Sequence, residues 1–324
     1  IGLNKLAQIP TRYTPLVPAT ILPANISRVI VALTSEEQLR DLSIIPNRKM
    51  VRLGKSGYLI SEIPLGKFYC DRYGANLVNI SEANLQLLLS DQTQSDQGNV
   101  LEGYDVDQNV IALTDQAMRE GKTKAYFSTY YAKLPLDKNS AHINTTWLGQ
   151  KQIAFQFSTE ETQHIVFLIP SDDNIDPNQW HHSIRDAAGS ALIQRPSAPK
   201  NPFDLDVSLL RSAVRLGSAW YQESWLFPET IHAGIEDAWV LSRMLENYEE
   251  ETNEALSNYT KYRLPRMNRF TRFTDNESSK LLNTGGAQRF AQHLRLAFST
   301  RFIPEIFISS QDWLHGYDCL RGFR

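Results

Sequence analysis

The sequence predicts a mixed α/β or α+β fold, and three observations support this prediction. Hydrophobic residues alternate in the middle of the chain, as in Ile153 to Phe157, which is typical of strands in a sheet. A strand-like end at Val214 to Gly217 is followed, after a turn-rich segment, by an amphipathic helix from Ile235 to Tyr248. A second helical segment runs from Glu254 to Arg272. We therefore expect a sheet covered on one face, with helices toward the C-terminus.

Composition and charge narrow the class of protein. At 324 residues the chain can form one large domain or two coupled domains. A net charge of -3 without a basic block makes nucleic acid a poor candidate partner. No apolar run approaches the roughly 20 residues of a membrane-spanning helix, so a cytoplasmic location is expected. Cys70 and Cys319 fit no metal spacing and are expected to be reduced thiols, and no metal site is predicted.

Local patterns place the elements of the first half in order. Prolines between Pro10 and Pro23 favour extended or turn backbone. The elements that follow are a short helix over Glu36 to Leu42, a β-hairpin over Lys49 to Ile63, a helix over Ile80 to Leu89 that Asn79 or Ser81 caps, and two strands over Val100 to Leu113.

The second half is predicted to be strand-rich and then helical. Its expected strands are Lys124 to Leu134, Thr146 to Gly149, Ile153 to Phe157 and His164 to Ile169, followed by a helix over Ser183 to Ile193. Four aromatic residues of these strands, Trp147, Phe155, Phe157 and Phe167, fit a sheet core, with a pocket for a planar substrate as the alternative.

The helix from Ile235 to Tyr248 is expected to pack in the core. Its predicted apolar face consists of Ile235, Ala238, Trp239, Leu241, Leu245 and Tyr248. Glu236 and Asp237 are expected in solvent, where first-turn carboxylates complement the helix dipole, with a general-acid role as the alternative. His232 is expected at the surface, with contact to a bound anion as the alternative, because the first amides of a helix lack intrahelical partners.

The strand, loop and helix around Gly217 carry a resemblance to a known family. Gly217, Ala219 and the run Ile235-Glu236-Asp237-Ala238 resemble the second flavin-contacting motif of the group A FAD-dependent aromatic-ring monooxygenases, the para-hydroxybenzoate and salicylate hydroxylases. Further segments resemble this family in the same order along the chain: Leu16 to Leu33, Thr146 to Gly149, Tyr259 to Arg266 and Asp312 to Asp318.

The resemblance implies a domain organisation. Residues 1–120 and 205–275 correspond to a remnant of a Rossmann-like FAD-binding domain, 121–204 to an antiparallel-sheet substrate domain, and 276–324 to a C-terminal helical extension. The first β-α-β unit of the family is absent. The parallel-sheet edge that remains is expected to be covered by the proline-rich N-terminus or by a partner chain.

The resemblance also implies a cofactor and a substrate class. FAD is the expected cofactor, NAD(P)H and O₂ the co-substrates, and an aromatic or quinone-like small molecule the substrate. No side chain is assigned as catalytic, because in this family the flavin carries the chemistry. The expected cofactor-binding positions are Asn25, Glu82, Gly217, Ser218, Pro228, Thr230 and Gly234.

Several positions depart from the family pattern and leave three functions open. The chain contains no G-x-G-x-x-G, the family's D-G motif is missing, Ser218 stands where the family has Asp, and Glu82 stands where it has Arg. An anion at Glu82 reverses the sign of the interaction with a diphosphate. The alternatives are an FAD-dependent monooxygenase, a flavin-free pseudoenzyme that binds a small aromatic molecule or a partner protein, and an inactive gene fragment. A homodimer also stays open.

Overall fold

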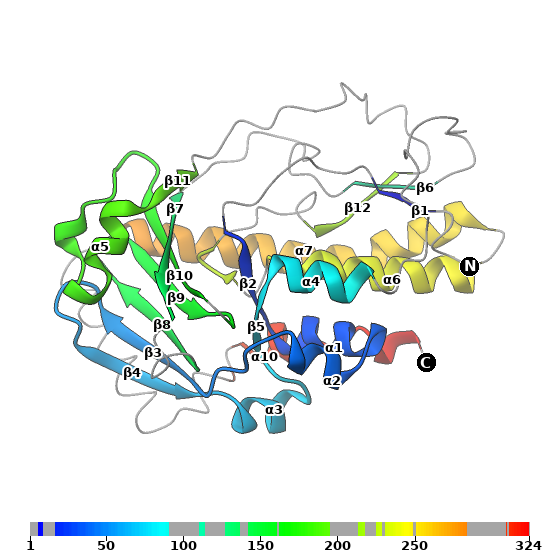
Figure 1. The fold of residues 1–324 in the computed structure, drawn as a ribbon. Coiled ribbons are helices and arrows are strands. Elements are labelled where there is room, and N and C mark those ends of the chain that lie inside the picture. Colours follow the sequence, from blue (N-terminus) through cyan, green and yellow to red (C-terminus); the bar gives the residue numbers. More distant parts are fainter. Residues whose placement is uncertain are drawn as a thin grey trace.

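The fold is known from a computed structural model. It describes residues 6–8, 17–90, 110–113, 127–136, 142–160, 162–194, 213–217, 225–228, 231–248, 251–283, 309 and 311–323. A large sheet forms one end of the molecule, helices and two small sheets form the other, and one long helix runs along both (Figure 1). The mixed α/β fold and its antiparallel sheet confirm the fold class predicted from the sequence.

The large sheet has seven strands in the order β11-β7-β10-β9-β8-β3-β4. Their bounds are β3 (Arg48–Leu53), β4 (Leu59–Pro64), β7 (Phe127–Pro135), β8 (Ile143–Leu148), β9 (Ile153–Ser158), β10 (Thr162–Pro170) and β11 (Leu192–Gln194). All neighbours are antiparallel except β3 and β8. The hairpin predicted around Gly54 and Gly57 is confirmed as β3 and β4, and it extends the sheet beyond residues 121–204.

One face of the large sheet is covered by helix α5 (His182–Ser190). Trp180 and Ile184 are fully buried there against sheet residues such as Phe167. The predicted helix over Ser183 to Ile193 is therefore too long, because its last residues form β11. Ile193 pairs with Tyr130 of β7, so hydrogen bonding to the sheet edge replaces the final helical turn.

The opposite face of the sheet packs on a second core. Strands β2 (Ala19–Leu22) and β5 (Val78–Ser81) form an antiparallel pair beside this core. Asn79 of β5 and Asn144 of β8 exchange two buried amide hydrogen bonds, with N···O distances of 2.8 and 3.0 Å. These bonds satisfy buried polar groups and fix the small pair against the large sheet.

Four short helices surround β2 and β5. They are α1 (Ala24–Leu33), α2 (Glu36–Asp41), α3 (Lys67–Tyr73) and α4 (Glu82–Ser90). Helix α2 confirms the prediction, with Ser35 accepting a hydrogen bond from the Gln38 amide. Sequence reasoning did not identify α1, which begins directly after Pro23, where the ring fixes an extended-to-helical transition.

A three-stranded parallel sheet lies beside these helices, in the order β1-β6-β12. Its strands are β1 (Leu6–Gln8), β6 (Val110–Leu113) and β12 (Ala213–Arg215). The edge of β6 that does not face β12 is paired by β1, which precedes the prolines, so cover by the proline-rich segment itself stays a prediction. The first of the two strands predicted over Val100 to Leu113 lies outside the described residues.

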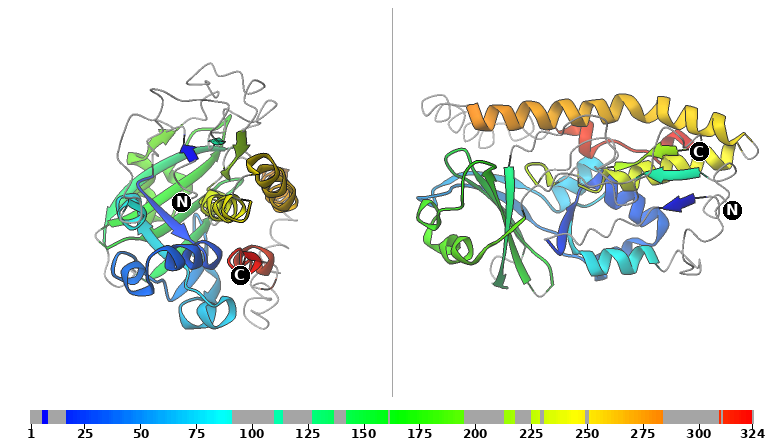
Figure 2. Two further views of the ribbon diagram at one scale, coloured as in Figure 1. Left: turned by 90° about the vertical axis from the view of Figure 1, so that its right-hand side faces the viewer. Right: turned by 90° about the horizontal axis from the view of Figure 1, so that it is seen from above.

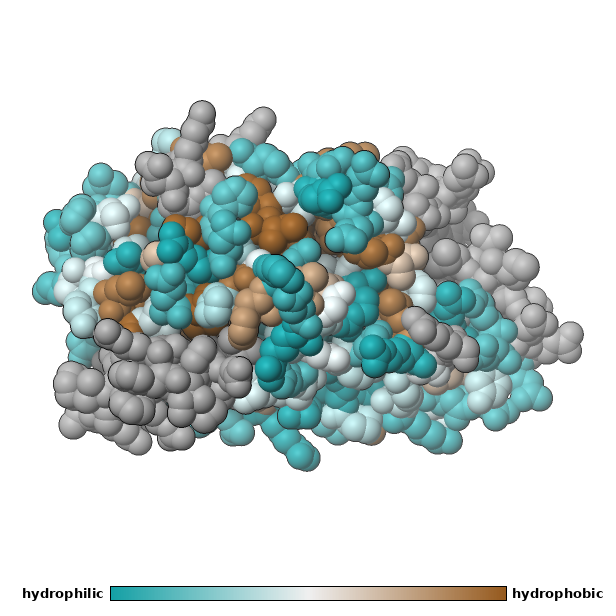
Figure 3. All heavy atoms as spheres, turned by 90° about the horizontal axis from the view of Figure 1, so that it is seen from below, coloured by the Kyte–Doolittle hydropathy of each residue, from teal (hydrophilic) through white to brown (hydrophobic). Residues whose placement is uncertain are grey.

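Two helices complete the fold. Helix α6 (Ala233–Asn247) packs on α1 and on α7 (Thr252–Asn283), and α7 extends along the molecule from the small parallel sheet to the large sheet (Figure 2). Pro265 lies inside α7 at an exposed position, and its lack of an amide hydrogen removes one helical hydrogen bond there. No helix in the described part of the chain is long and apolar enough to cross a membrane. Seen from below, a mostly hydrophilic surface is interrupted by hydrophobic residues (Figure 3).

The buried face of α6 differs from the predicted one. Its buried residues are Ala233, Glu236, Asp237, Val240, Leu241, Met244 and Leu245. Ala238 is exposed, and Ile235 and Trp239 are only partly buried. The prediction was wrong because it placed the two carboxylates in solvent, which rotated the assumed apolar face around the helix.

Candidate functional site

The site is built around the start of α6. Gly217 follows strand β12 with a φ of 48°, a left-handed conformation that favours glycine. A Cβ atom added to Gly234 would lie 3.4 Å from the Gly217 Cα atom, at ordinary van der Waals distance, so the two residues are neighbours. The amide of Gly217 donates to Asp237 Oδ2 at 2.7 Å. Two glycines thus bring the strand end against the first turn of the helix.

Four buried charged side chains lie directly behind this junction. Glu236, Asp237 and Arg263 are 0% exposed, and Arg266 is 9% exposed. Arg263 donates to Asp237 Oδ1 at 2.5 Å and to Glu236 Oε2 at 2.9 Å. Arg266 donates hydrogen bonds to both carboxylate oxygen atoms of Glu236, each at 2.7 Å. The expectation that both carboxylates are solvated is wrong, since two guanidinium groups of α7 neutralise them in the interior.

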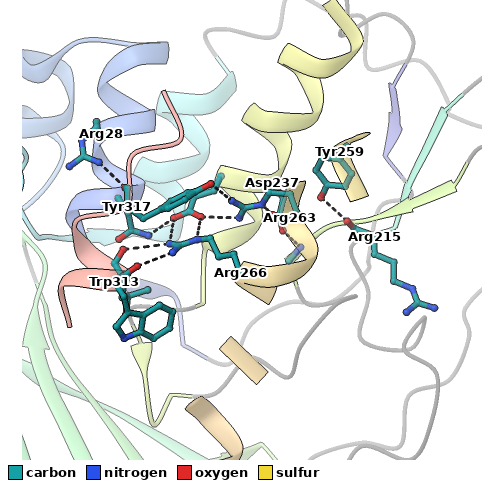
Figure 4. A network of polar contacts seen from close by, with 12 residues as sticks. Arg28, Arg215, Asp237, Tyr259, Arg263, Arg266, Trp313 and Tyr317 are labelled. Atoms are coloured by element: carbon teal, nitrogen blue, oxygen red, sulfur yellow. Dashed lines mark hydrogen bonds and ion pairs between the residues drawn. The ribbon is translucent and has the colours of Figure 1, made fainter. Parts of the chain in front are cut away.

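The same hydrogen-bond network reaches α1 and the C-terminal segment, residues 311–323 (Figure 4). Asn25 of α1 donates to Glu236 Oε1 at 2.6 Å. Arg266 also donates to the Trp313 carbonyl at 3.0 Å, and its guanidinium carbon lies 3.7 Å from the Tyr317 ring centroid. Arg263 donates to the Tyr317 hydroxyl at 2.9 Å. We call Asn25, Glu236, Asp237, Arg263, Arg266 and Tyr317 the buried network.

Burial and charge act in opposite directions on its carboxylates. Burial disfavours ionisation of Glu236, but Arg266 and Arg263 outweigh it and hold the pKa of Glu236 below its ordinary value. Burial dominates at Asp237 and raises its pKa, although Arg263 and the Gly217 amide oppose this rise. The pKa of Arg263 is raised despite burial, because Asp237 and Glu236 favour its charged form. Both guanidinium groups are therefore committed to protein carboxylates.

A second contact lies at the same helix start. His232 directly precedes α6, and its Nε2 lies 3.6 Å from Oε1 of Glu82, the first residue of α4. Their side chains are 18% and 24% exposed, so the expectation of a surface histidine is wrong. Burial lowers the pKa of His232 to about 4 and raises the pKa of Glu82.

The structure brings four of the seven predicted cofactor positions together. Gly217 and Gly234 are neighbours, Asn25 donates a hydrogen bond to Glu236 of α6, and Glu82 faces His232. The Pro228 carbonyl accepts a hydrogen bond from the Ile231 amide at 3.2 Å, just before the helix. Ser218 and Thr230 lie outside the described residues.

Sequence reasoning missed Arg263 and Arg266 as part of this region. Their sequence signal is their spacing: two arginines three residues apart on one predicted helix match two adjacent acids on another. Two acids and two arginines can be buried together because their charges cancel, whereas burial of the two acids alone or of the two arginines alone would be very costly.

The four aromatic residues predicted for the sheet divide between its two faces. Trp147 and Phe167 pack under α5, whereas Phe155 and Phe157 lie on the other face. There Phe157 stacks on Trp225, with ring centroids 5.8 Å apart and an interplanar angle of 19°. All four side chains are buried in hydrophobic clusters, which confirms that they belong to a sheet core, with a separate cluster on each face.

Phe157 also stacks on a buried histidine of the same sheet face. His164 of β10 contacts the Tyr131 hydroxyl through Nδ1 at 2.8 Å and the Thr159 hydroxyl through Nε2 at 2.9 Å. Burial and the charge of Lys133 lower the pKa of His164 to about 4. Its neutral ring is therefore a satisfied core group. In the described part of the chain, no group of three or more His, Cys, Asp or Glu could hold a metal ion.

Solved structures of other proteins share the overall fold of this chain. No protein-family model and no curated protein matches the sequence. Solved structures do match: HpxO of Klebsiella pneumoniae in complex with FAD and uric acid has a TM-score of 0.71 and 14% identity, over 94% of this chain and 89% of that one. The chain thus has the fold of the FAD-dependent monooxygenases, as the resemblance predicted.

Two further structures support the same class. PqsL, a probable FAD-dependent monooxygenase of Pseudomonas aeruginosa, has a TM-score of 0.63 and 12% identity, over 91% of this chain and 92% of that one. A substrate complex of salicylate hydroxylase has a TM-score of 0.64 and 14% identity, over 93% of this chain and 88% of that one. Identities this low establish the fold and leave the activity to the residues of the site.

The described residues fit FAD in backbone shape, with one departure in charge. The turn at Gly217 has a φ of 48°, which favours glycine, and the first amides of α6 can donate to ligand oxygen atoms. The buried Nε2 atom of His232 makes no hydrogen bond to another described residue. The departure is Glu82, whose carboxyl group would oppose a nearby diphosphate.

Proposed function

We propose that this protein is an FAD-dependent monooxygenase that hydroxylates an aromatic or quinone-like small molecule with NAD(P)H as the electron donor. The observation that carries the proposal is the agreement of fold with FAD-dependent monooxygenases over about nine-tenths of the chain. The HpxO structure contains FAD and uric acid, and a PqsL structure contains 2-aminobenzoylacetate. Small organic substrates are therefore the class to test.

The residues of this chain have defined parts in the proposal. Gly217, Gly234 and the first amides of α6 would contact the cofactor, and Asn25 would support them through Glu236. Ser218, Pro228 and Thr230 would complete the loop around it. Bound FAD supplies the oxygen chemistry, and the protein supplies orientation and a dry environment. Trp225 and Phe157 would form the side toward the large sheet.

A flavin-free binding protein is the second candidate, and the Glu82–His232 contact favours it. This contact places a carboxyl group and a histidine with a lowered pKa beside α6, where a diphosphate would require cations. The two buried arginines cannot supply the missing charge, because Glu236 and Asp237 hold them. In this case the same helix start would bind an uncharged planar ligand.

The test is the visible spectrum of purified protein before and after soaking with excess FAD and desalting. The first proposal predicts retained flavin absorption bands and, with added phenols, faster NAD(P)H oxidation. Glu82→Gln removes the opposing charge and is expected to tighten FAD binding by about fivefold, since such a pair is worth about 1 kcal/mol. A colourless protein in both forms would contradict the enzyme proposal and leave the binding protein.

The homodimer, the cytoplasmic location and the domain limits near residues 120, 204 and 275 stay predictions. Strands β3 and β4 belong to the large sheet although they precede residue 121, and α7 crosses residue 275 without a break.

A further inference from the structure

We propose that Tyr317 and Arg263 are positioning residues that hold Gly217 in its ligand-binding conformation through Asp237. This inference rests on the proposed function for its effect on the cofactor. Its geometry is independent of any ligand, because each contact lies between protein atoms. Through these contacts the C-terminal segment, residues 311–323, helps to position a site on the other side of α6.

The first step joins Gly217 to α6. The only polar hydrogen of the Gly217 backbone points to Asp237 Oδ2 at 2.7 Å. Glycine at a φ of 48° has no side chain to restrict it, so among the described residues this bond restrains the Gly217 amide. The orientation of the Asp237 carboxylate therefore sets the position of the Gly217 amide.

The second step joins Asp237 to α7. Arg263 Nε donates to the other carboxylate oxygen, Oδ1, at 2.5 Å, and Nη2 of the same guanidinium donates to Glu236 at 2.9 Å. A planar guanidinium with two fixed partners cannot turn without losing both bonds. Arg263 thus fixes the plane of the Asp237 carboxylate.

The third step joins Arg263 to the C-terminal segment. The remaining Nη1 group donates to the Tyr317 hydroxyl at 2.9 Å, and the Tyr317 ring lies over the Arg266 guanidinium (Figure 4). The Tyr317 carbonyl accepts from Arg28 of α1 at 2.8 Å, which anchors the backbone at this point. The hydroxyl of Tyr317 is therefore held in place and completes the hydrogen bonding of Arg263.

The segment has a second, separate anchor that provides a matched control. Asp312 accepts from the Tyr73 hydroxyl at 2.8 Å and pairs with Arg72 at 2.5 Å. Tyr73→Phe removes one hydroxyl that binds this segment, as Tyr317→Phe does. Only Tyr317→Phe removes a hydrogen bond to Arg263. Comparing the two variants therefore separates an effect on the position of Gly217 from a general loosening of the C-terminal segment.

The experiment measures hydrogen–deuterium exchange of the peptide that contains Gly217, in ligand-free wild type, Tyr317→Phe and Tyr73→Phe, and then the FAD dissociation constant of each. Thermal unfolding checks that each variant is folded. We expect Tyr317→Phe to speed exchange at the Gly217 amide by about tenfold and to weaken FAD binding, because a bond to a charged group is lost. Tyr73→Phe is expected to match wild type in both measurements.

Two results would overturn the inference: exchange at Gly217 that Tyr317→Phe leaves unchanged, or an equal rise in both variants. Failure of the proposed function has a different signature. If wild type binds no FAD, that proposal fails, and the exchange comparison still decides whether Tyr317 positions Gly217.

Discussion

At the residue scale, the central feature is the neutral balance of two buried acids and two buried arginines. Glu236 carries three charge-assisted hydrogen bonds from guanidinium groups and one from the Asn25 amide. Burying either sign alone would be very costly, whereas the balanced set is tolerated. This balance explains why first-turn acids, which usually face solvent, lie in the core of this protein.

Neutralising one member of the set should unbalance the rest. Glu236→Gln leaves one guanidinium charge without a carboxylate, and we expect the free energy of unfolding to fall by about 3 to 5 kcal/mol. The matched control is Glu246→Gln, which breaks an exposed pair with Arg243 on the same helix and should cost about 0.5 kcal/mol or less. Urea unfolding of both variants measures the difference, and equal losses would contradict the burial of the network.

Buried neutral His164 should make stability depend on pH. Its pKa is lowered to about 4, so between pH 6.5 and 4 the unfolded chain binds a proton that the folded protein does not bind. Stability from this group is complete above pH 6.5 and is lost as the pH falls. His164→Gln should reduce the loss of unfolding free energy between pH 7.5 and 5 by about 2 kcal/mol.

The measurement is urea unfolding at both pH values. His142→Gln, at an exposed position, is the control and should leave the pH dependence near that of wild type. A His164→Gln profile identical to that of wild type would show that the protonated ring is accommodated in the folded sheet.

At the scale of elements, the junction of β12 and α6 is the feature on which ligand binding depends. Gly217→Ala forces an alanine into a left-handed conformation, at a cost of about 1 to 2 kcal/mol. The turn should relieve this strain by shifting away from the first amide groups of α6. FAD binding should weaken in this variant, as flavin fluorescence titration would measure.

Gly74→Ala is the control for backbone strain. Gly74 has a φ of 74°, and an added Cβ meets no other atom within 4 Å, so the substitution carries a similar strain away from the site. It should lower stability with no change in FAD affinity. If Gly217→Ala bound FAD as tightly as Gly74→Ala, the junction would not be part of the ligand site.

The elements also show where sequence reasoning succeeds and where it ends. Alternation of hydrophobic residues predicted the hairpin β3–β4 and strands β7 to β10, because a half-buried strand imposes a period of two. The helix of α6 was predicted, but its buried face was not. Burial of Glu236 is decided by Arg263 and Arg266 on another helix, and a pattern within one helix carries no such information.

At the scale of the whole molecule, α7 and the C-terminal segment join parts that are distant in the sequence. Helix α7 packs Tyr259 against β12 and α6, and Phe270 against Trp313 of the C-terminal segment. The family resemblance predicted the fold class, whereas the junction of α7 with the C-terminal segment was not predicted. The residues that hold the C-terminal segment in place became evident only in three dimensions.

The most direct test of the account is a crystal structure of the protein grown with FAD. We expect the seven-stranded sheet, Glu236 and Asp237 buried against Arg263 and Arg266, and flavin density against Gly217, Gly234 and the start of α6. Flavin bound elsewhere, or the two carboxylates facing solvent, would contradict it.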